Sequence, residues 1–240
     1  MKIDKNIVLD LLYPRRCPLC GEVRPYRQSV ACPDCFKELK VVAAPHCFKC
    51  GKTIASDEEE YCQDCETIPK SFKQGFPVFE YTGAIKDALY DFKYHNQRDY
   101  AEFFAECVEK RYGKRFRELQ VDGIVPVPVH KKKRKSRGYN QAELLAKELS
   151  GRLQVPMYPN YLVRQINTSP QKELNNISRM KNLKNAFKIG KNTVQLKRIL
   201  LVDDIYTSGA TIESCTGVLL SEGAEEVYYT SVAIGQGYSG

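Results

Sequence analysis

The stretch that decides the fold is Arg198-Ile-Leu-Leu-Val-Asp-Asp-Ile-Tyr-Thr-Ser-Gly-Ala-Thr-Ile-Glu213. Residues 199–202 form a continuous apolar run, which is typical of a parallel strand that is buried on both faces. After a run of small and hydroxylated residues, apolar side chains recur at 212, 215, 218 and 219, and Gly223 closes this pattern. The spacing indicates an amphipathic helix that ends at a glycine. The stretch therefore predicts a buried strand, a short loop and a helix.

The loop and the acids before it predict a site for a sugar phosphate. Asp203 and Asp204 directly follow the apolar run, and open α/β sheets bind ligands at the carboxyl ends of their strands. Backbone N–H groups at a loop and helix N-terminus favour a phosphate, while carboxylates accept hydrogen bonds from sugar hydroxyls or hold Mg²⁺. The predicted phosphate-binding residues are Thr207, Ser208, Gly209, Ala210 and Thr211.

Residues 202–211 resemble the phosphoribosyl pyrophosphate (PRPP) motif of type I phosphoribosyltransferases. The resemblance implies that Asp203 and Asp204 face the ribose hydroxyls, with Mg²⁺ accompanying PRPP, and that residues 207–211 wrap the 5′-phosphate. An acidic strand-to-helix turn without a ligand is the simpler alternative. A run of this length with every element in order argues against that alternative.

The composition describes a globular protein with a basic surface. Of 240 residues, 28% are charged and 42% are hydrophobic, and the net charge is +8. This charge favours a polyanionic partner, although phosphorylated small molecules would also explain local basic patches. No apolar run is long enough for a membrane span. Residues 1–13 are interrupted by Asp10 and lack a small-residue cleavage site, so they predict a short helix rather than a signal peptide.

Eight of the ten cysteines form four Cys-x-x-Cys pairs, which begin at positions 17, 32, 47 and 62. Cys-Pro-Leu-Cys-Gly at 17–21 matches Cys-Phe-Lys-Cys-Gly at 47–51, and Cys-Pro-Asp-Cys at 32–35 matches Cys-Gln-Asp-Cys at 62–65. The pattern predicts a tandem duplication of one unit that contains two pairs.

Two Cys-x-x-Cys pairs can close one tetrahedral zinc site, so the chain is expected to hold two structural zinc ions. The first ligand set is Cys17, Cys20, Cys32 and Cys35, and the second is Cys47, Cys50, Cys62 and Cys65. A cross-braced arrangement, in which the first and third pairs share a metal, stays open. Disulfides are disfavoured because nothing marks the chain as exported. Cys107 and Cys215 lie on predicted helix faces and are expected in the core.

The chain is expected to divide into a double zinc-binding module, residues 1–70, and an α/β domain, residues 71–240. A strand is predicted at 76–81, followed by helices at 83–92 and from 100 to about 112. These helices either cover the edge of the parallel sheet or form a lid over a nucleotide. The run at 124–129 is the first clear core strand, and strands are also expected at 162–164 and 227–234.

Two basic segments are expected to face the same crevice as the acidic strand end. The first is a loop that contains Lys131, Lys132, Lys133 and Lys135, which are expected to be solvated or to face a polyanion. By resemblance to type I phosphoribosyltransferases, Arg137 and Gly138 would contact pyrophosphate. The second segment, 161–198, carries nine basic residues and one acid, and is interpreted as a mobile loop. Its cations that could stabilise a leaving pyrophosphate are Arg164, Lys172, Arg179 and Lys181.

In order, the chain has the cysteine pairs, a Val-Pro-Val-Pro strand, Arg137-Gly-Tyr-Asn-Gln-Ala142, Gln171, Arg179-x-x-Asn182, Phe187 and the PRPP motif. This set resembles the ComF family of bacterial late-competence proteins. The resemblance implies a type I phosphoribosyltransferase fold and a cytoplasmic role in handling incoming single-stranded DNA, alongside a competence helicase or other DNA-processing proteins. Four cysteine pairs exceed those of the simplest members, so the second zinc site is inferred from this sequence alone.

Two classes of function stay open at this stage. One is a single-stranded DNA-binding protein with a PRPP-type pocket for recognition or regulation, in which tyrosines stack on bases. The tyrosines considered for stacking are Tyr139, Tyr158, Tyr161 and Tyr206. The other is an active phosphoribosyltransferase that transfers phosphoribosyl from PRPP to an unknown base or amine, although no nucleobase hood is recognisable in the sequence.

Overall fold

The computed structural model describes residues 14–24, 30–165, 186–190 and 194–235. The helix expected within residues 1–13 lies outside these ranges. So do Gln171, Lys172, Arg179, Lys181 and Asn182, so for this part of the segment 161–198 the interpretation as a loop that closes over a leaving group stays a prediction.

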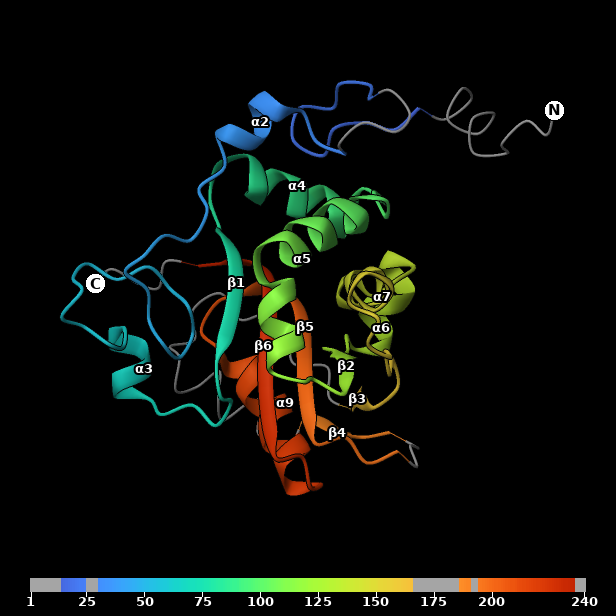
Figure 1. Ribbon diagram of the computed structural model, residues 1–240. Coiled ribbons are helices and arrows are strands. Elements are labelled where there is room, and N and C mark those ends of the chain that lie inside the picture. Colours follow the sequence, from blue (N-terminus) through green and yellow to red (C-terminus); the bar gives the residue numbers. More distant parts are fainter. Residues whose placement is uncertain (1–13, 25–29, 166–185, 191–193, 236–240) are drawn as a thin grey trace.

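The centre of the molecule is a parallel sheet of four strands in the order β1-β6-β5-β2 (Figure 1). The strands are β1 (Gly75–Glu80), β2 (Gly123–Pro126), β5 (Arg198–Tyr206) and β6 (Glu226–Ile234). The apolar run at 199–202 is completely buried, as expected for a strand that is covered on both faces.

Two details of the sheet go beyond the sequence-based expectation. The strand predicted at 76–81 was not assigned a place, and in the structure β1 pairs with β6 as one of the parallel strands. β5 does not end before the acids but continues through Asp203 and Asp204 to Tyr206, since β6 provides a partner along this whole length.

Helices cover both faces of the sheet. On one face lie α5 (Tyr100–Glu118) and α7 (Gln141–Leu153), and α4 (Gly83–Tyr94) packs on α5. On the other face lies α9 (Ala210–Ser221), next to a small antiparallel pair formed by β3 (Leu162–Arg164) and β4 (Phe187–Ile189). Cys107 of α5 and Cys215 of α9 are buried core residues, as predicted.

The basic run after β2 is a helix and not a loop. It forms α6 (Lys131–Arg137), whose first turn is capped by His130 because its Nδ1 accepts a hydrogen bond of 3.2 Å from the amide of Lys132. Gly138 ends the helix in the left-handed conformation, with φ +80°. Lysine and arginine have high helix propensity, so the expectation of a loop underestimated the local preference of this run.

The two cysteine-rich units pack on opposite faces of the α/β domain. The first unit, with α2 (Pro33–Lys37), joins the apolar cluster of α4, α5 and α7 through Cys17, Ala31 and Leu39. The second unit, with α3 (Gln63–Thr67), joins the apolar cluster on the α9 side. In Figure 1, α2 lies near α4, whereas α3 lies on the side of β1 that is opposite α5.

The segment between the two units covers the free edge of the sheet. Val41 pairs antiparallel with Phe79 of β1, and the amide of Val42 donates a hydrogen bond of 3.0 Å to the carbonyl oxygen of Val78. The sequence left open whether α4 and α5 cover an edge of the sheet. At the edge strand β1, the segment between the two zinc-binding units covers the edge instead. The boundary between residues 70 and 71 stays a prediction. Within the described ranges, no helix is long and apolar enough to cross a membrane.

Candidate functional site

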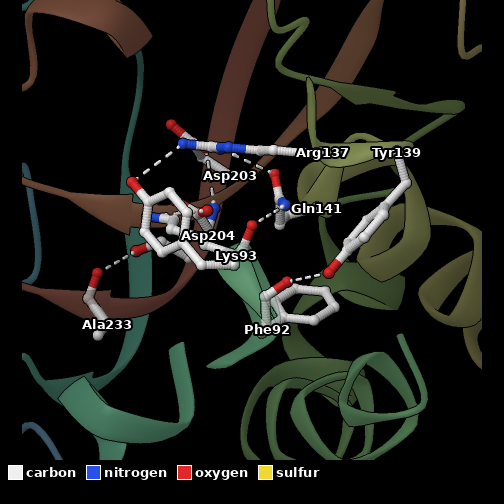
Figure 2. A network of polar contacts seen from close by, with 10 residues as sticks. Phe92, Lys93, Arg137, Tyr139, Gln141, Asp203, Asp204 and Ala233 are labelled. Carbon is white, nitrogen blue, oxygen red and sulfur yellow. Dashed lines mark hydrogen bonds and ion pairs between the residues drawn. The ribbon is translucent and has the colours of Figure 1, made fainter. Parts of the chain in front are cut away.

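The two acids lie side by side at the end of β5 that faces α4. The amide of Asp204 donates a hydrogen bond of 2.9 Å to Oδ1 of Asp203. Oδ2 of Asp204 lies 3.0 Å from Nζ of Lys93, which comes from the last turn of α4 (Figure 2). Only 13% of the Asp204 side chain and 19% of the Lys93 side chain are exposed, so this ion pair is largely shielded from solvent.

The environment of Asp203 disfavours the ionised form of its carboxyl group. Burial raises the pKa of Asp203 to about 7, and the neighbouring charge of Asp204 acts in the same direction. Lys93 and Arg164 partly offset this effect. Near neutral pH the two acids therefore carry fewer than two negative charges, and a bound cation would favour the fully ionised pair.

The loop after β5 presents backbone amides that lack backbone partners in the described part of the chain. No amide from 207 to 212 donates a loop or cap hydrogen bond to a backbone carbonyl within the described residues. Gly209 precedes α9 with φ +75°, and a Cβ at this position would lie 2.2 Å from Oη of Tyr206. The close approach of Tyr206 therefore requires glycine. The free amides and the N-terminal end of a helix of 12 residues together favour an anion.

Arg137 and α4 border a cavity of about 480 Å³, which is also lined by Lys93, the ion-pair partner of Asp204. Nη1 of Arg137 donates to Oε1 of Gln141 at 3.1 Å, and Nη2 donates to Oη of Tyr94 at 3.2 Å (Figure 2). The residues that line the cavity are Lys93, Tyr94, Asn96, Lys133, Ser136 and Arg137. Three cations within one hollow make it suitable for a polyphosphate or a nucleotide.

The predicted basic residues divide into two groups. Lys131, Lys132 and Lys135 are exposed, whereas Lys133 is half-buried in the wall of the cavity. Burial lowers the pKa of Lys133, and repulsion from Arg164 and Arg137 lowers it further. That the two basic segments face one crevice stays a prediction.

Three of the four tyrosines that were expected to stack on bases are buried instead. Tyr139 donates a hydrogen bond to the carbonyl oxygen of Phe92, and Tyr206 stacks on Tyr229 with ring centroids 4.7 Å apart. Tyr161 is also buried, and Tyr158 is half-buried against it. For Tyr139, Tyr161 and Tyr206 the expectation was wrong, because their rings pack in the core, where no base can reach them.

The structure also shows residues that the sequence did not single out. No motif around Lys93 in the sequence marks it as a site residue, because its partner Asp204 lies far away in the chain. Tyr90 and Tyr94 are 54% and 55% exposed on α4. Their helical positions lie off the apolar face formed by 85, 88, 89 and 92, and this spacing could have identified them as exposed.

The eight paired cysteines form two compact clusters, and the pairing is sequential. Within each cluster all four sulfur atoms lie within 4.8 Å of one another. The sulfurs of Cys20 and Cys32 are 3.7 Å apart, and those of Cys50 and Cys62 are 3.6 Å apart. Zn–S bonds of about 2.3 Å in a tetrahedron require S···S distances of roughly 3.8 Å, so both clusters fit zinc. The cross-braced alternative is excluded because neither cluster mixes the two units.

The two metal centres differ in their surroundings. All four cysteines of the second centre are buried, whereas Cys20 of the first is exposed. In the second centre, hydrogen bonds from Cys50, Cys62 and Cys65 hold the pKa of Cys47 well below that of an ordinary thiol. The same contacts raise the pKa of Cys50 and Cys65, so the four thiolates would form together only with a bound cation that offsets their repulsion.

The fold and these sites define a class of protein: a double zinc ribbon joined to a parallel α/β domain that carries an acidic strand end and a phosphate-type loop. A family model described as "Double zinc ribbon domain" matches residues 8–66. Competence protein F from Haemophilus influenzae is 32% identical over 181 residues, which cover 72% of this chain and 78% of that protein. The chain belongs to this competence protein F (ComF) family, as the sequence indicated.

Two further relatives, from Escherichia coli and Bacillus subtilis, support the assignment. DNA utilization protein YhgH from Escherichia coli K12 is 29% identical, over 69% of this chain and 74% of its own. Competence protein ComFC from Bacillus subtilis is 27% identical, and the match covers 68% of this chain and 67% of that protein. Among solved structures, a purine phosphoribosyltransferase from Pyrococcus horikoshii Ot3 matches at 17% identity with a TM-score of 0.30, over 59% of this chain and 84% of that chain.

Proposed function

We propose that this protein handles single-stranded DNA during natural transformation and that its α/β domain binds PRPP with Mg²⁺. The observation that carries the proposal is the arrangement at the end of β5: two adjacent acids, then a loop with free amides, beside a basic cavity. This arrangement offers acceptors for ribose hydroxyls, donors for a 5′-phosphate and cations for a pyrophosphate.

Mg²⁺ suits the acidic end of the proposed site. Carboxylate oxygens are the ligands that Mg²⁺ prefers, and Lys93 already neutralises one of the two acids. Mg²⁺ bound with PRPP would take over this role. Lys93 would then turn to the pyrophosphate in the cavity that it lines, where Arg137 is the second cation.

The DNA role is supported by charge and by the names of the relatives. The net charge is +8, and α6 exposes Lys131, Lys132 and Lys135 next to the cavity. Two relatives are named as competence proteins and one as a DNA utilization protein. We propose that the exposed face of α6 contacts the phosphates of a single strand and that this occurs in the cytoplasm with DNA-processing partners, including a helicase.

Calorimetric titration with PRPP, with and without Mg²⁺, tests the site. The double variant Asp203→Asn/Asp204→Asn should weaken binding by at least tenfold, since a hydrogen bond to a charged group contributes about 1.5–3 kcal/mol. The matched control is Glu58→Gln/Glu59→Gln, which removes two exposed carboxylates in the second zinc unit. Equal affinity in the wild type and the Asp double variant would refute the assignment. Repeating the titration with single-stranded DNA present measures any coupling between the two ligands.

An active phosphoribosyltransferase is the second candidate. The observation in its favour is the pair of acids followed by the loop with free amides, an arrangement that would hold PRPP while an acceptor displaces its pyrophosphate. Release of pyrophosphate from PRPP in the presence of candidate acceptors would establish this activity. Its dependence on Arg137, tested with Arg137→Gln, would separate turnover by this site from a contaminating enzyme.

A further inference from the structure

Two exposed tyrosines lie next to each other on α4, and one of them, Tyr94, lines the basic cavity. The ring centroids of Tyr90 and Tyr94 are 4.9 Å apart, and more than half of each residue is exposed. His95 lies edge-on to Tyr90, with centroids 5.4 Å apart. Tyr94 also lines the cavity and accepts a hydrogen bond from Arg137, which the proposed PRPP site uses, whereas that proposal gives Tyr90 no role.

The position of the pair is not explained by helix stability alone. Aromatic residues four positions apart on a helix attract each other weakly, and this attraction accounts for the contact between the rings. It does not account for their location. The guanidinium of Arg137 lies 4.9 Å from the centroid of Tyr94, and Lys133 lines the same cavity. A cation therefore lies over the ring of Tyr94, which is more than half exposed to water.

We propose that Tyr90 and Tyr94 form a stacking platform for the bases of single-stranded DNA, while the cations of α6 hold the adjacent phosphates. Aromatic rings next to a positively charged surface are the combination with which proteins bind single strands without regard to sequence. Bases in a duplex are already stacked and paired, so the platform selects unpaired strands. This inference rests on the proposed DNA role and deepens it: it assigns the base contacts to α4 and leaves the phosphate contacts to α6.

The arrangement also connects the two ligands of the proposed function. Arg137 donates to the Tyr94 hydroxyl and borders the cavity proposed for pyrophosphate. A base on Tyr94 and a pyrophosphate in the cavity therefore share Arg137. Binding of one ligand should alter the affinity for the other.

The test compares a thymidine oligonucleotide with an abasic oligonucleotide of the same length by fluorescence anisotropy. The wild type should bind the thymidine strand more tightly, because both strands carry the same phosphates but only one can stack. Tyr90→Leu/Tyr94→Leu should lose about 5- to 150-fold in affinity for the thymidine strand, which corresponds to ~1–3 kcal/mol per stacked base, and should bind the abasic strand as the wild type does.

Two further variants serve as controls. Tyr94→Phe keeps the ring and should retain the preference for the thymidine strand. Tyr61→Leu removes a tyrosine that is 40% exposed in the second zinc unit, and should have no effect.

The outcomes separate this inference from the proposed function. Salt-dependent binding of both strands with equal affinity, unchanged in Tyr90→Leu/Tyr94→Leu, would overturn the platform while leaving the DNA role intact. If the wild type bound neither the thymidine strand nor the abasic strand, both the platform and the proposed DNA role would be overturned. A loss for both strands in the double variant would mean that the tyrosines support α6 rather than contact bases, and would also overturn the proposal.

Discussion

The hydroxyl of Tyr229 donates a hydrogen bond of 2.7 Å to the carbonyl oxygen of Cys50, and thereby joins the central strand β6 to a ligand of the second zinc centre. The ring of Tyr229 stacks on Tyr206, whose hydroxyl lies against Gly209 at the phosphate loop. Phe72, which is completely buried, packs edge-on against both tyrosine rings. The second zinc centre is therefore packed into the same cluster that shapes the phosphate loop.

Tyr229→Phe should reduce the free energy of unfolding by about 1–3 kcal/mol, because it leaves the buried Cys50 carbonyl oxygen without its donor. Chemical denaturation measures this change. Tyr228→Phe is the matched control, since that hydroxyl donates to the partly exposed carboxylate of Glu226, which water can solvate instead. Equal costs for the two variants would contradict the coupling through Cys50.

The duplicated glycines Gly21 and Gly51 offer a second comparison. Both have φ +76°, so alanine should cost each position about 1–2 kcal/mol of conformational strain. A Cβ at 51 would also lie 2.6 Å from Cδ of Pro77 in β1, whereas a Cβ at 21 meets nothing within 4 Å. Gly51→Ala should therefore destabilise the protein clearly more than Gly21→Ala in thermal denaturation. A larger effect at Gly21 would show that the first unit is the more tightly packed one.

Metal analysis of protein purified under reducing conditions should give two zinc ions per chain, one for each four-cysteine cluster. Cys17→Ser should lower the content to one and spare the sheet. Cys50→Ser should also lower it to one, but should destabilise the sheet as well, because Cys50 contacts Tyr229. Far-UV circular dichroism with a thermal scan distinguishes the two outcomes. Disulfides in place of zinc would refute the assignment.

The raised pKa of Asp203 predicts a pH-dependent stability. The folded protein holds this proton up to a pKa of about 7, compared with an ordinary value of 3.8, so the contribution of Asp203 to stability falls as pH rises between these values. Asp203→Asn should therefore stabilise the unliganded protein, increasingly so up to about pH 7. Thermal scans across this range measure the effect.

Binding of Mg²⁺ with PRPP should favour the ionised form of Asp203, so the affinity should increase as pH rises through about 7. An affinity that is independent of pH would count against Asp203 as a ligand.

The slope of DNA affinity against salt reports the phosphate contacts of α6. For single strands the slope is about −0.7 per neutralised phosphate, so replacing Lys131, Lys132, Lys133 and Lys135 by Ala should flatten it by up to ~0.7 for each lysine in contact. The control variant replaces four exposed lysines on other surfaces, Lys37, Lys110, Lys114 and Lys147, which equalises the change in net charge. Equal slopes for the two quadruple variants would show that α6 is not the contact surface.

The sequence determined the elements whose signal is local. The apolar run at 199–202, the small residues after Asp204 and the helical spacing that follows specify a strand, a loop and a helix, because each signal depends on neighbouring side chains and backbone preference. The spacing of the cysteines likewise predicted two four-cysteine sites, although a cross-braced pairing also satisfied it. Only the positions of the two units in space excluded that alternative.

The tertiary structure decided every feature that depends on residues distant in the chain. Lys93 reaches Asp204 because α4 and β5 meet, and Tyr139 and Tyr206 are buried because other elements pack on them. The two zinc units came from one repeated pattern, yet the second is buried against β6 and the first is more exposed. Local spacing sets which atoms can form a site, whereas burial and charge pairing arise only when remote segments come together.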